Sequence, residues 1–142
     1  VEGWALYAES LGKELGLYED PYQYFGMLSM EMHRAIRLVV DTGLHGKGWT
    51  REQAIQYSLD NEAESEASII AEIERYMATP SQALSYKLGQ LKIRELRTKA
   101  EDALGDRFNV KEFHNQVLNS GSLPLVLLEE KINNWISLEI KG

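Results

Sequence analysis

The sequence of 142 residues contains no cysteine and only three prolines. Without cysteine, the chain can form neither disulfide bonds nor thiolate metal sites, and the redox compartment cannot be inferred from cysteine usage. Pro21, Pro80 and Pro124 each stand where a helix could begin, which is where helices tolerate proline. The scarcity of proline elsewhere favours long helical segments.

Basic residues and long apolar runs are also scarce. Fifteen Lys and Arg oppose 22 Asp and Glu, so the net charge is -7. An acidic chain with no dense basic segment argues against nucleic acid and anionic membranes as partners. No apolar stretch approaches the roughly 18 residues that can span a bilayer, so we expect no membrane-spanning segment.

The first residues lie inside an amphipathic pattern. The chain has no initiator Met, and Glu2 stands where the basic start of a signal peptide would be. We therefore expect the sequence to be a piece of a longer protein. Its length is that of one ordinary domain, so we expect residues 1–142 to fold as a single unit.

Helical periodicity extends along most of the chain, and no segment shows sustained two-residue alternation. We therefore predict an all-α domain of about seven helices. Asp20 before Pro21 is a typical helix start, and Thr50 with Gln53 has the spacing of a capping box. The expected helices run from the N-terminus to about 16, then over 21–43, 50–59, 65–77, 79–104, 109–121 and 124–140.

Three apolar stripes are expected to build the core. They belong to the first, second and fifth expected helices, where apolar residues recur at the spacing of one helix face. The side chains predicted to be largely buried are Trp4, Leu11, Leu28, Met32, Ile36, Leu88, Leu91 and Leu104.

The second expected helix also carries a polar face. His33, Arg37 and Asp41 follow one another at intervals of four, so Arg37 and Asp41 can pair along the helix, and His45 comes just after its end. One interpretation is a surface ion pair with a solvent-exposed histidine. The other is an anion-binding cluster for a carboxylate or oxyanion, which the flanking apolar residues favour because a buried arginine needs a partner.

Tyr86 and Gly89 stand three residues apart in the fifth expected helix and therefore share a face. A glycine inside a helix costs about 1 kcal/mol relative to alanine, so it usually has a packing reason. Gly89 could permit a close helix crossing, with Tyr86 as an aromatic residue at the edge of the core. Alternatively, the phenol could stay accessible and donate a hydrogen bond to developing negative charge.

Several other kinds of site find no support in the sequence. A carboxylate-bridged di-metal bundle needs Glu-x-x-His elements, and none of His33, His45 and His114 has a glutamate three residues before it. No glycine-flanked serine supports a Ser-His-Asp triad, and no glycine-rich phosphate loop is present.

Five sequence blocks, in this order and spacing, resemble the C-terminal part of the bacterial uncharacterised-domain family numbered 885. They cover nearly the whole chain, which makes the resemblance far more specific than a single short motif. The blocks are EGWALYAESLG (2–12), RLVVDTGLH (37–45), GWTREQAI (48–55), YMATPSQALSYKLGQLKIRELRTKAEDALG (76–105) and EFHNQVLNSGSLPLVLLE (112–129).

That family resembles zinc metallopeptidases of the gluzincin kind, in which two histidines of an H-E-x-x-H helix and a later glutamate bind zinc. The resemblance implies that Glu2 is the third zinc ligand in the full-length parent, with Glu9 and Asp41 supporting the site. It also implies a peptide substrate. Tyr86 would stabilise the tetrahedral oxyanion, and Arg37 with His45 would contact the substrate or the oxyanion; these roles are implied by the resemblance.

The sequence departs from the family pattern at two points. No H-E-x-x-H occurs in it, so we expect no zinc and no peptidase activity in this fragment alone. Ser81 follows Pro80 where the family has glycine. We also expect the fragment to self-associate, because an apolar surface normally covered by the catalytic half would be exposed.

Two alternatives to the peptidase remain open. One is a helical structural or interaction module without catalysis, in which Arg37, Asp41 and the histidines form an ion network. The other is a zinc hydrolase that acts on a non-peptide amide or ester, since the same zinc chemistry would permit it.

Overall fold

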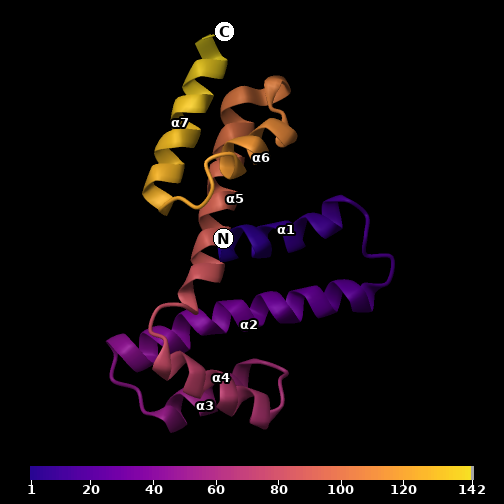
Figure 1. Cartoon of the computed structure of the whole chain (residues 1–142). Coiled ribbons are helices and arrows are strands. Elements are labelled where there is room, and N and C mark those ends of the chain that lie inside the picture. Colours follow the sequence, from indigo (N-terminus) through magenta and orange to yellow (C-terminus); the bar gives the residue numbers. More distant parts are fainter. Residues whose placement is uncertain (142) are drawn as a thin grey trace.

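The structure, a computed structural model, describes residues 1–141, and all regular structure in this range is helical, as predicted (Figure 1). The elements are α1 (Glu2–Glu14), α2 (Pro21–Gly46), α3 (Arg51–Asn61), α4 (Glu66–Ala78), α5 (Leu84–Leu104), the 3-10 turn η1 (Gly105–Arg107), α6 (Val110–Leu118) and α7 (Leu125–Lys141).

Side chains cap the helices at the starts predicted from sequence. Asp20 accepts a hydrogen bond from the backbone N–H of Tyr22, with Pro21 as the first helical residue. Thr50 and Gln53 form the expected reciprocal capping box of α3. These caps satisfy backbone N–H groups that have no partner inside the helix.

The fifth helix begins later than predicted. Residues 79–83 form turns, and α5 starts at Leu84 rather than at Pro80. Ser81 has a φ of 68°, in the left-handed region that favours glycine. This conformation fits the expectation of glycine at position 81, and it interrupts the helix there.

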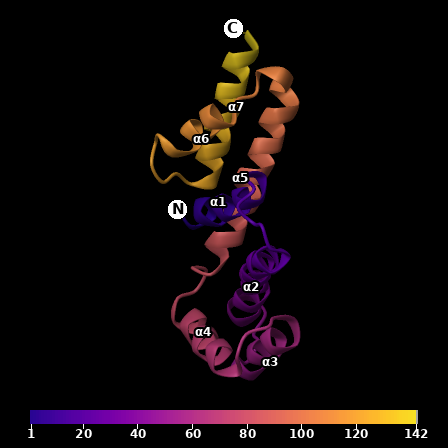
Figure 2. The ribbon, with the colours of Figure 1, turned by 90° about the vertical axis from the view of Figure 1, so that its right-hand side faces the viewer.

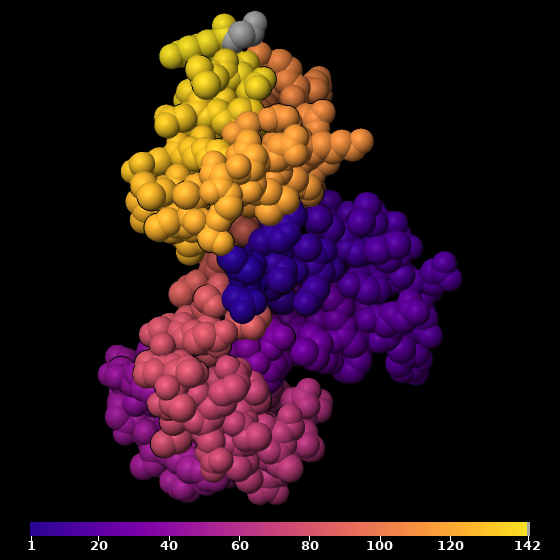
Figure 3. Space-filling view, viewed as in Figure 1, coloured from indigo at the N-terminus to yellow at the C-terminus, as the bar shows by residue number. Residues whose placement is uncertain are grey.

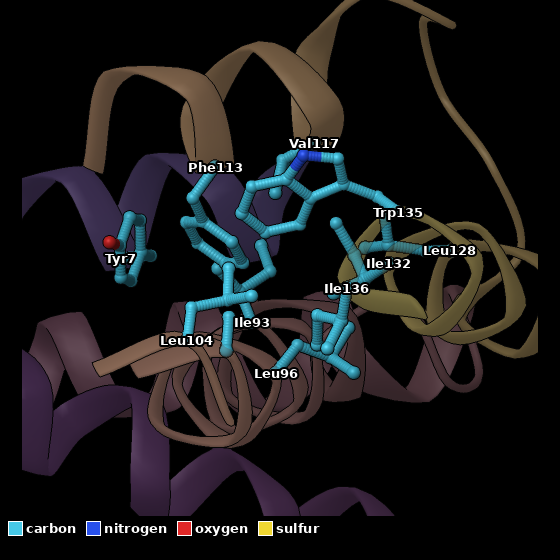
Figure 4. Close-up of a cluster of buried hydrophobic side chains, with 11 residues drawn as sticks. Tyr7, Ile93, Leu96, Leu104, Phe113, Val117, Leu128, Ile132, Trp135 and Ile136 are labelled. Atoms are coloured by element: carbon cyan, nitrogen blue, oxygen red, sulfur yellow. The ribbon is translucent and has the colours of Figure 1, made fainter. Parts of the chain in front are cut away.

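The first of two cores lies between α1, α5, α6 and α7. The buried Tyr7 contributes to it from α1, and Trp4 and Leu11 pack against its edge. Figure 4 shows how side chains of α5 and α7 converge with Phe113 of α6. The buried residues of this core are Tyr7, Ile93, Leu96, Ala100, Leu104, Phe113, Val117, Leu128, Ile132, Trp135 and Ile136.

The second core lies between the C-terminal half of α2 and the helices α3 and α4. The buried residues of this second core are Ile36, Val40, Ala54, Ile55, Ile69, Ile73, Tyr76 and Ala83. Because α2 is buried in this core whereas α1 and α5 are buried in the first, the prediction that the three helices share one core is wrong.

Two of the eight expected core residues, Ile36 and Leu104, are buried, and Trp4 and Leu11 are partly buried. The other four are exposed because they lie on faces of α2 and α5 that neither core covers. Their exposed fractions are 42% for Leu28, 52% for Met32, 47% for Leu88 and 48% for Leu91.

Helix α5 links the two cores. In both views it extends from the α3–α4 end of the molecule to the α6–α7 end, and α1 crosses it in its first half (Figures 1 and 2). A Cβ added to Gly3 would lie 2.4 Å from the Cα of Gly89, so the two backbones touch at this crossing. The packing reason for the helical Gly89 is therefore the close approach of α1.

Candidate functional site

A pocket of about 630 Å³ opens beside the N-terminal end of α1. The first turn of α1, the first half of α5 and residues 117–128 line it. Figure 3 shows the start of α1 (indigo) against the α6–α7 segment (orange and yellow), with part of α5 between them. The lining residues are Val1, Glu2, Gly3, Trp4, Ser81, Leu84, Ser85, Leu88, Gly89, Ile93, Val117, Leu118, Gly121, Ser122, Leu123, Pro124, Leu125 and Leu128.

Glu2 has the only ionisable side chain among the described residues that line this pocket. It is partly buried and lies in the first turn of α1, where the helix dipole favours a carboxylate. The contact between Gly3 and Gly89 sets its position, and Gln90 secures the crossing by donating a hydrogen bond of 3.3 Å to the carbonyl of Leu6. The fold thus places one carboxylate on the wall of a mainly apolar pocket.

Arg37 is buried, but its partner is not the one predicted. Its Nη2 donates a hydrogen bond of 2.7 Å to Glu72, and its guanidinium lies 5.3 Å from the ring centroid of Tyr76 and 5.2 Å from that of Tyr86. The predicted pairing with Asp41 is wrong because a nearer acceptor, Glu72 of α4, packs against this face of α2.

The carboxylate of Glu72 accepts hydrogen bonds from three side chains. Arg75 and the hydroxyl of Tyr76 donate to it from the same helix, and Arg37 donates from α2. The hydrogen bonds from Arg75, with those of Tyr76 and the nearby positive charges, outweigh the effect of burial and lower the pKa of Glu72 to about 2. Sequence reasoning missed Glu72, although its spacing to Arg75 and Tyr76 is a recognisable helical pattern.

Asp41 and His45 fix the connection that follows α4. Both carboxylate oxygens of Asp41 accept from the backbone N–H of Ser81, at 3.2 and 3.1 Å. Nε2 of His45 donates to the carbonyl of Tyr76 at 3.0 Å. Since Ser81 lines the pocket, Asp41 positions part of the pocket wall from a buried site.

The structure thus brings together some of the predicted site residues and separates others. Arg37 lies against Tyr86, whose ring also stacks with Arg34 at 4.7 Å. Glu2 belongs to the pocket wall, which does not include Tyr86. The side chain of Glu9 is exposed, and its backbone carbonyl accepts a hydrogen bond from Tyr18.

A second polar network, also missed from sequence, lies on the other side of α1. Arg97 binds both carboxylate oxygens of Glu14 and donates to the hydroxyl of Tyr7 at 3.1 Å, and this hydroxyl is also hydrogen-bonded to Nε2 of His114. Burial and the positive charge of Arg97 lower the pKa of His114, which disfavours the charged form of its ring. The hydrogen-bonded pairs of this network lie 83 to 107 residues apart in the sequence, which no local pattern reveals.

Within residues 1–141, no group of three or more His, Asp or Glu side chains is placed to hold a metal ion. A metal site that uses Glu2 therefore needs further ligands from elsewhere. In the same range, no helix combines the length and the apolar character required to cross a bilayer.

Fold and site together define an all-helical domain with an apolar pocket beside one carboxylate. The sequence pattern of the family described as "Bacterial protein of unknown function (DUF885)" matches residues 1–132, and the chain belongs to this family. No curated protein matches the chain.

The fold is also found in a crystal structure described as that of "the putative lipoprotein from Colwellia psychrerythraea". The two chains share 54% sequence identity with a TM-score of 0.93. The match covers 96% of this chain but only 23% of the other, so the chain spans less than a quarter of that protein's length.

Proposed function

We propose that this chain is the C-terminal part of a zinc-dependent metallopeptidase and that Glu2 is the third zinc ligand of the full-length enzyme. The observation that carries the proposal is the position of Glu2. It is a partly buried carboxylate on the wall of an apolar pocket, held there by a backbone-to-backbone helix crossing. The order and spacing of the five sequence blocks, which resemble a gluzincin-like family, support it further.

The residues of this chain fit one ligand position of such a site and not a complete site. A carboxylate oxygen is a normal zinc ligand at about 2.0–2.2 Å, but no group of three potential ligands occurs within residues 1–141. Most of the Colwellia protein lies outside the region that matches this chain, which leaves room in a longer relative for two histidines. When bound, zinc would supply an activated water for attack on an amide.

The other proposed roles belong to the cluster around Tyr86. Its phenol is proposed to donate a hydrogen bond to the oxygen on which charge develops. Arg34 and Arg37 stack on the Tyr86 ring and thereby orient it. Arg37 and His45 are proposed to act near the substrate, while Asp41 supports the pocket wall through Ser81.

The proposal is tested by the metal content of the full-length protein. Glu2→Ala should abolish stoichiometric zinc or reduce peptidase activity by orders of magnitude, since water cannot replace a lost ligand without loosening the site. Glu19→Ala removes an exposed carboxylate from the loop between α1 and α2, and it should retain zinc. Zinc and activity that remain intact in Glu2→Ala would contradict the assignment of Glu2.

One observation favours the alternative of a non-catalytic helical module. Arg37, Asp41 and His45 each already have a partner within the chain, as structural residues do. The full-length sequence separates the two proposals, because an H-E-x-x-H motif upstream of Val1 is required by the peptidase. A substrate screen of the full-length protein would separate a peptidase from a zinc hydrolase of another amide or an ester.

A further inference from the structure

The pocket beside Glu2 has a lining that the role of a zinc ligand does not explain. Its floor consists of Ile93, Val117 and Leu128, which are buried members of the first core. Its walls include Leu88 and Leu118, whose exposed fractions are 47% and 48%. A volume of about 630 Å³ falls within the range of sites that bind small molecules. The pocket therefore offers a concave apolar surface that is open to a ligand.

A second pocket, between α1, α2 and α5, differs in its chemistry. Six charged residues line it, and all of them except Lys13 are paired with one another: Arg97 with Glu14 and Glu101, and Arg94 with Glu31. In the pocket beside Glu2, the polar side-chain groups are the Glu2 carboxylate, serine hydroxyls and the indole N–H of Trp4, so a charged ligand group would exchange its hydration for few polar partners. This pocket therefore favours an apolar group.

We propose that this pocket holds the bulky apolar side chain, such as that of Leu, Met or Phe, of the substrate residue next to the scissile bond. Glu2 lies on the pocket wall, so an amide held at a metal on Glu2 would direct a neighbouring side chain into the apolar space. This inference names the substrate class of the proposed peptidase and rests on that proposed function.

Trp4 gives a local readout of ligand binding, since Trp4 lines the pocket whereas Trp49 and Trp135 lie elsewhere. The indole N–H resonances of the ¹⁵N-labelled chain would be followed by NMR without metal. N-acetyl-leucinamide and N-acetyl-phenylalaninamide should shift the Trp4 resonance saturably. N-acetyl-glycinamide should bind at least about tenfold more weakly, because it has no side chain to bury.

Leu88 and Leu91 form a matched pair for the mutational test. Both lie on α5 with nearly equal exposed fractions of 47% and 48%, but only Leu88 lines the pocket. Leu88→Asp should weaken binding of N-acetyl-phenylalaninamide at least about tenfold, and Leu91→Asp should change it less than about twofold. Unchanged Trp49 and Trp135 resonances would show that each variant remains folded.

Absence of a saturable Trp4 shift, or equal losses in the two variants, would overturn the inference. The measurement needs no zinc, so its failure is distinguishable from failure of the proposed function. Binding at the pocket together with a Glu2→Ala enzyme that keeps its zinc would contradict only the ligand assignment.

Discussion

At the scale of single residues, buried polar groups determine the local geometry near the pocket. Asp41 is 1% exposed, and its carboxylate accepts hydrogen bonds from the backbone N–H of Ser81, a residue in the left-handed region of φ. The carboxylate of Glu72, on α4, likewise accepts a hydrogen bond from the Arg37 side chain on α2. In both cases a charged acceptor from one segment satisfies a donor from another, so its loss leaves a buried group without a partner.

Asp41→Ala should therefore destabilise the folded chain by about 1–3 kcal/mol, because the N–H of Ser81 loses its acceptor. Asp41→Asn keeps one acceptor oxygen of the same shape and should cost less. Urea unfolding followed by circular dichroism measures both. Equal stability of Asp41→Ala and the unchanged chain would contradict the role given to Asp41.

The pKa of Glu72 predicts a pH dependence of stability. It is lowered from its ordinary value of 4.5 to about 2 in the folded protein, chiefly by hydrogen bonds from Arg75. The ionised Glu72 therefore stabilises the fold at pH values above 4.5, and this contribution is lost as the pH falls from 4.5 to about 2. The urea midpoint should decrease over this range, and less steeply in Glu72→Gln. Parallel pH profiles of the two proteins would refute the assignment.

At the scale of elements, the crossing of α1 over α5 is what brings Glu2 to the pocket. No Cβ separates the two backbones at Gly3 and Gly89. The crossing also selects which face of α5 is buried: Gly89, Ile93 and Leu96 face inward, whereas Leu88 and Leu91 face outward.

Gly89→Ala should destabilise the protein by about 1–3 kcal/mol through overpacking, because its Cβ would lie 2.7 Å from the Cα of Gly3. This loss opposes the gain of about 1 kcal/mol that alanine brings to a helix interior. Gly26 of α2 provides the control, since a Cβ there meets no atom within 4 Å. Gly26→Ala should raise stability by about 0.5–1 kcal/mol. Thermal and urea unfolding compare both variants, and a stabilising Gly89→Ala would disprove the close crossing.

The positions of the helices could be predicted from sequence more reliably than the segments against which each helix packs. Caps such as Asp20 and Thr50 are local signals, so the starts of α2 and α3 were predictable. The apolar stripe of α2 was also recognisable, but periodicity does not reveal what covers it. Ile36 is buried by α3 and α4, whereas Met32, one turn earlier, is 52% exposed. Contacts between distant residues, such as Arg37 with Glu72, lie beyond any local pattern.

At the scale of the whole molecule, two cores joined by α5 leave apolar surface outside both. Phe25, Leu28 and Met32 share one face of α2, and their exposed fractions are 64%, 42% and 52%. A contiguous apolar face of this kind usually marks an interaction surface.

This face of α2 leads us to predict that the isolated chain self-associates at high concentration. Sedimentation velocity should show a concentration-dependent dimer or larger species, and Phe25→Lys with Met32→Lys should shift it to the monomer. Leu138→Lys, on α7 and 69% exposed in the unchanged chain, is the control and should have little effect. A clean monomer of the unchanged chain at high concentration would contradict the prediction.

The central claim, that Glu2 is a zinc ligand in the full-length protein, has one most direct measurement. Crystals of the full-length protein, grown with zinc, would be measured on both sides of the zinc absorption edge. The account predicts an anomalous peak about 2.0–2.2 Å from a carboxylate oxygen of Glu2. A zinc peak that is coordinated without Glu2, or no peak beside this carboxylate, would contradict it.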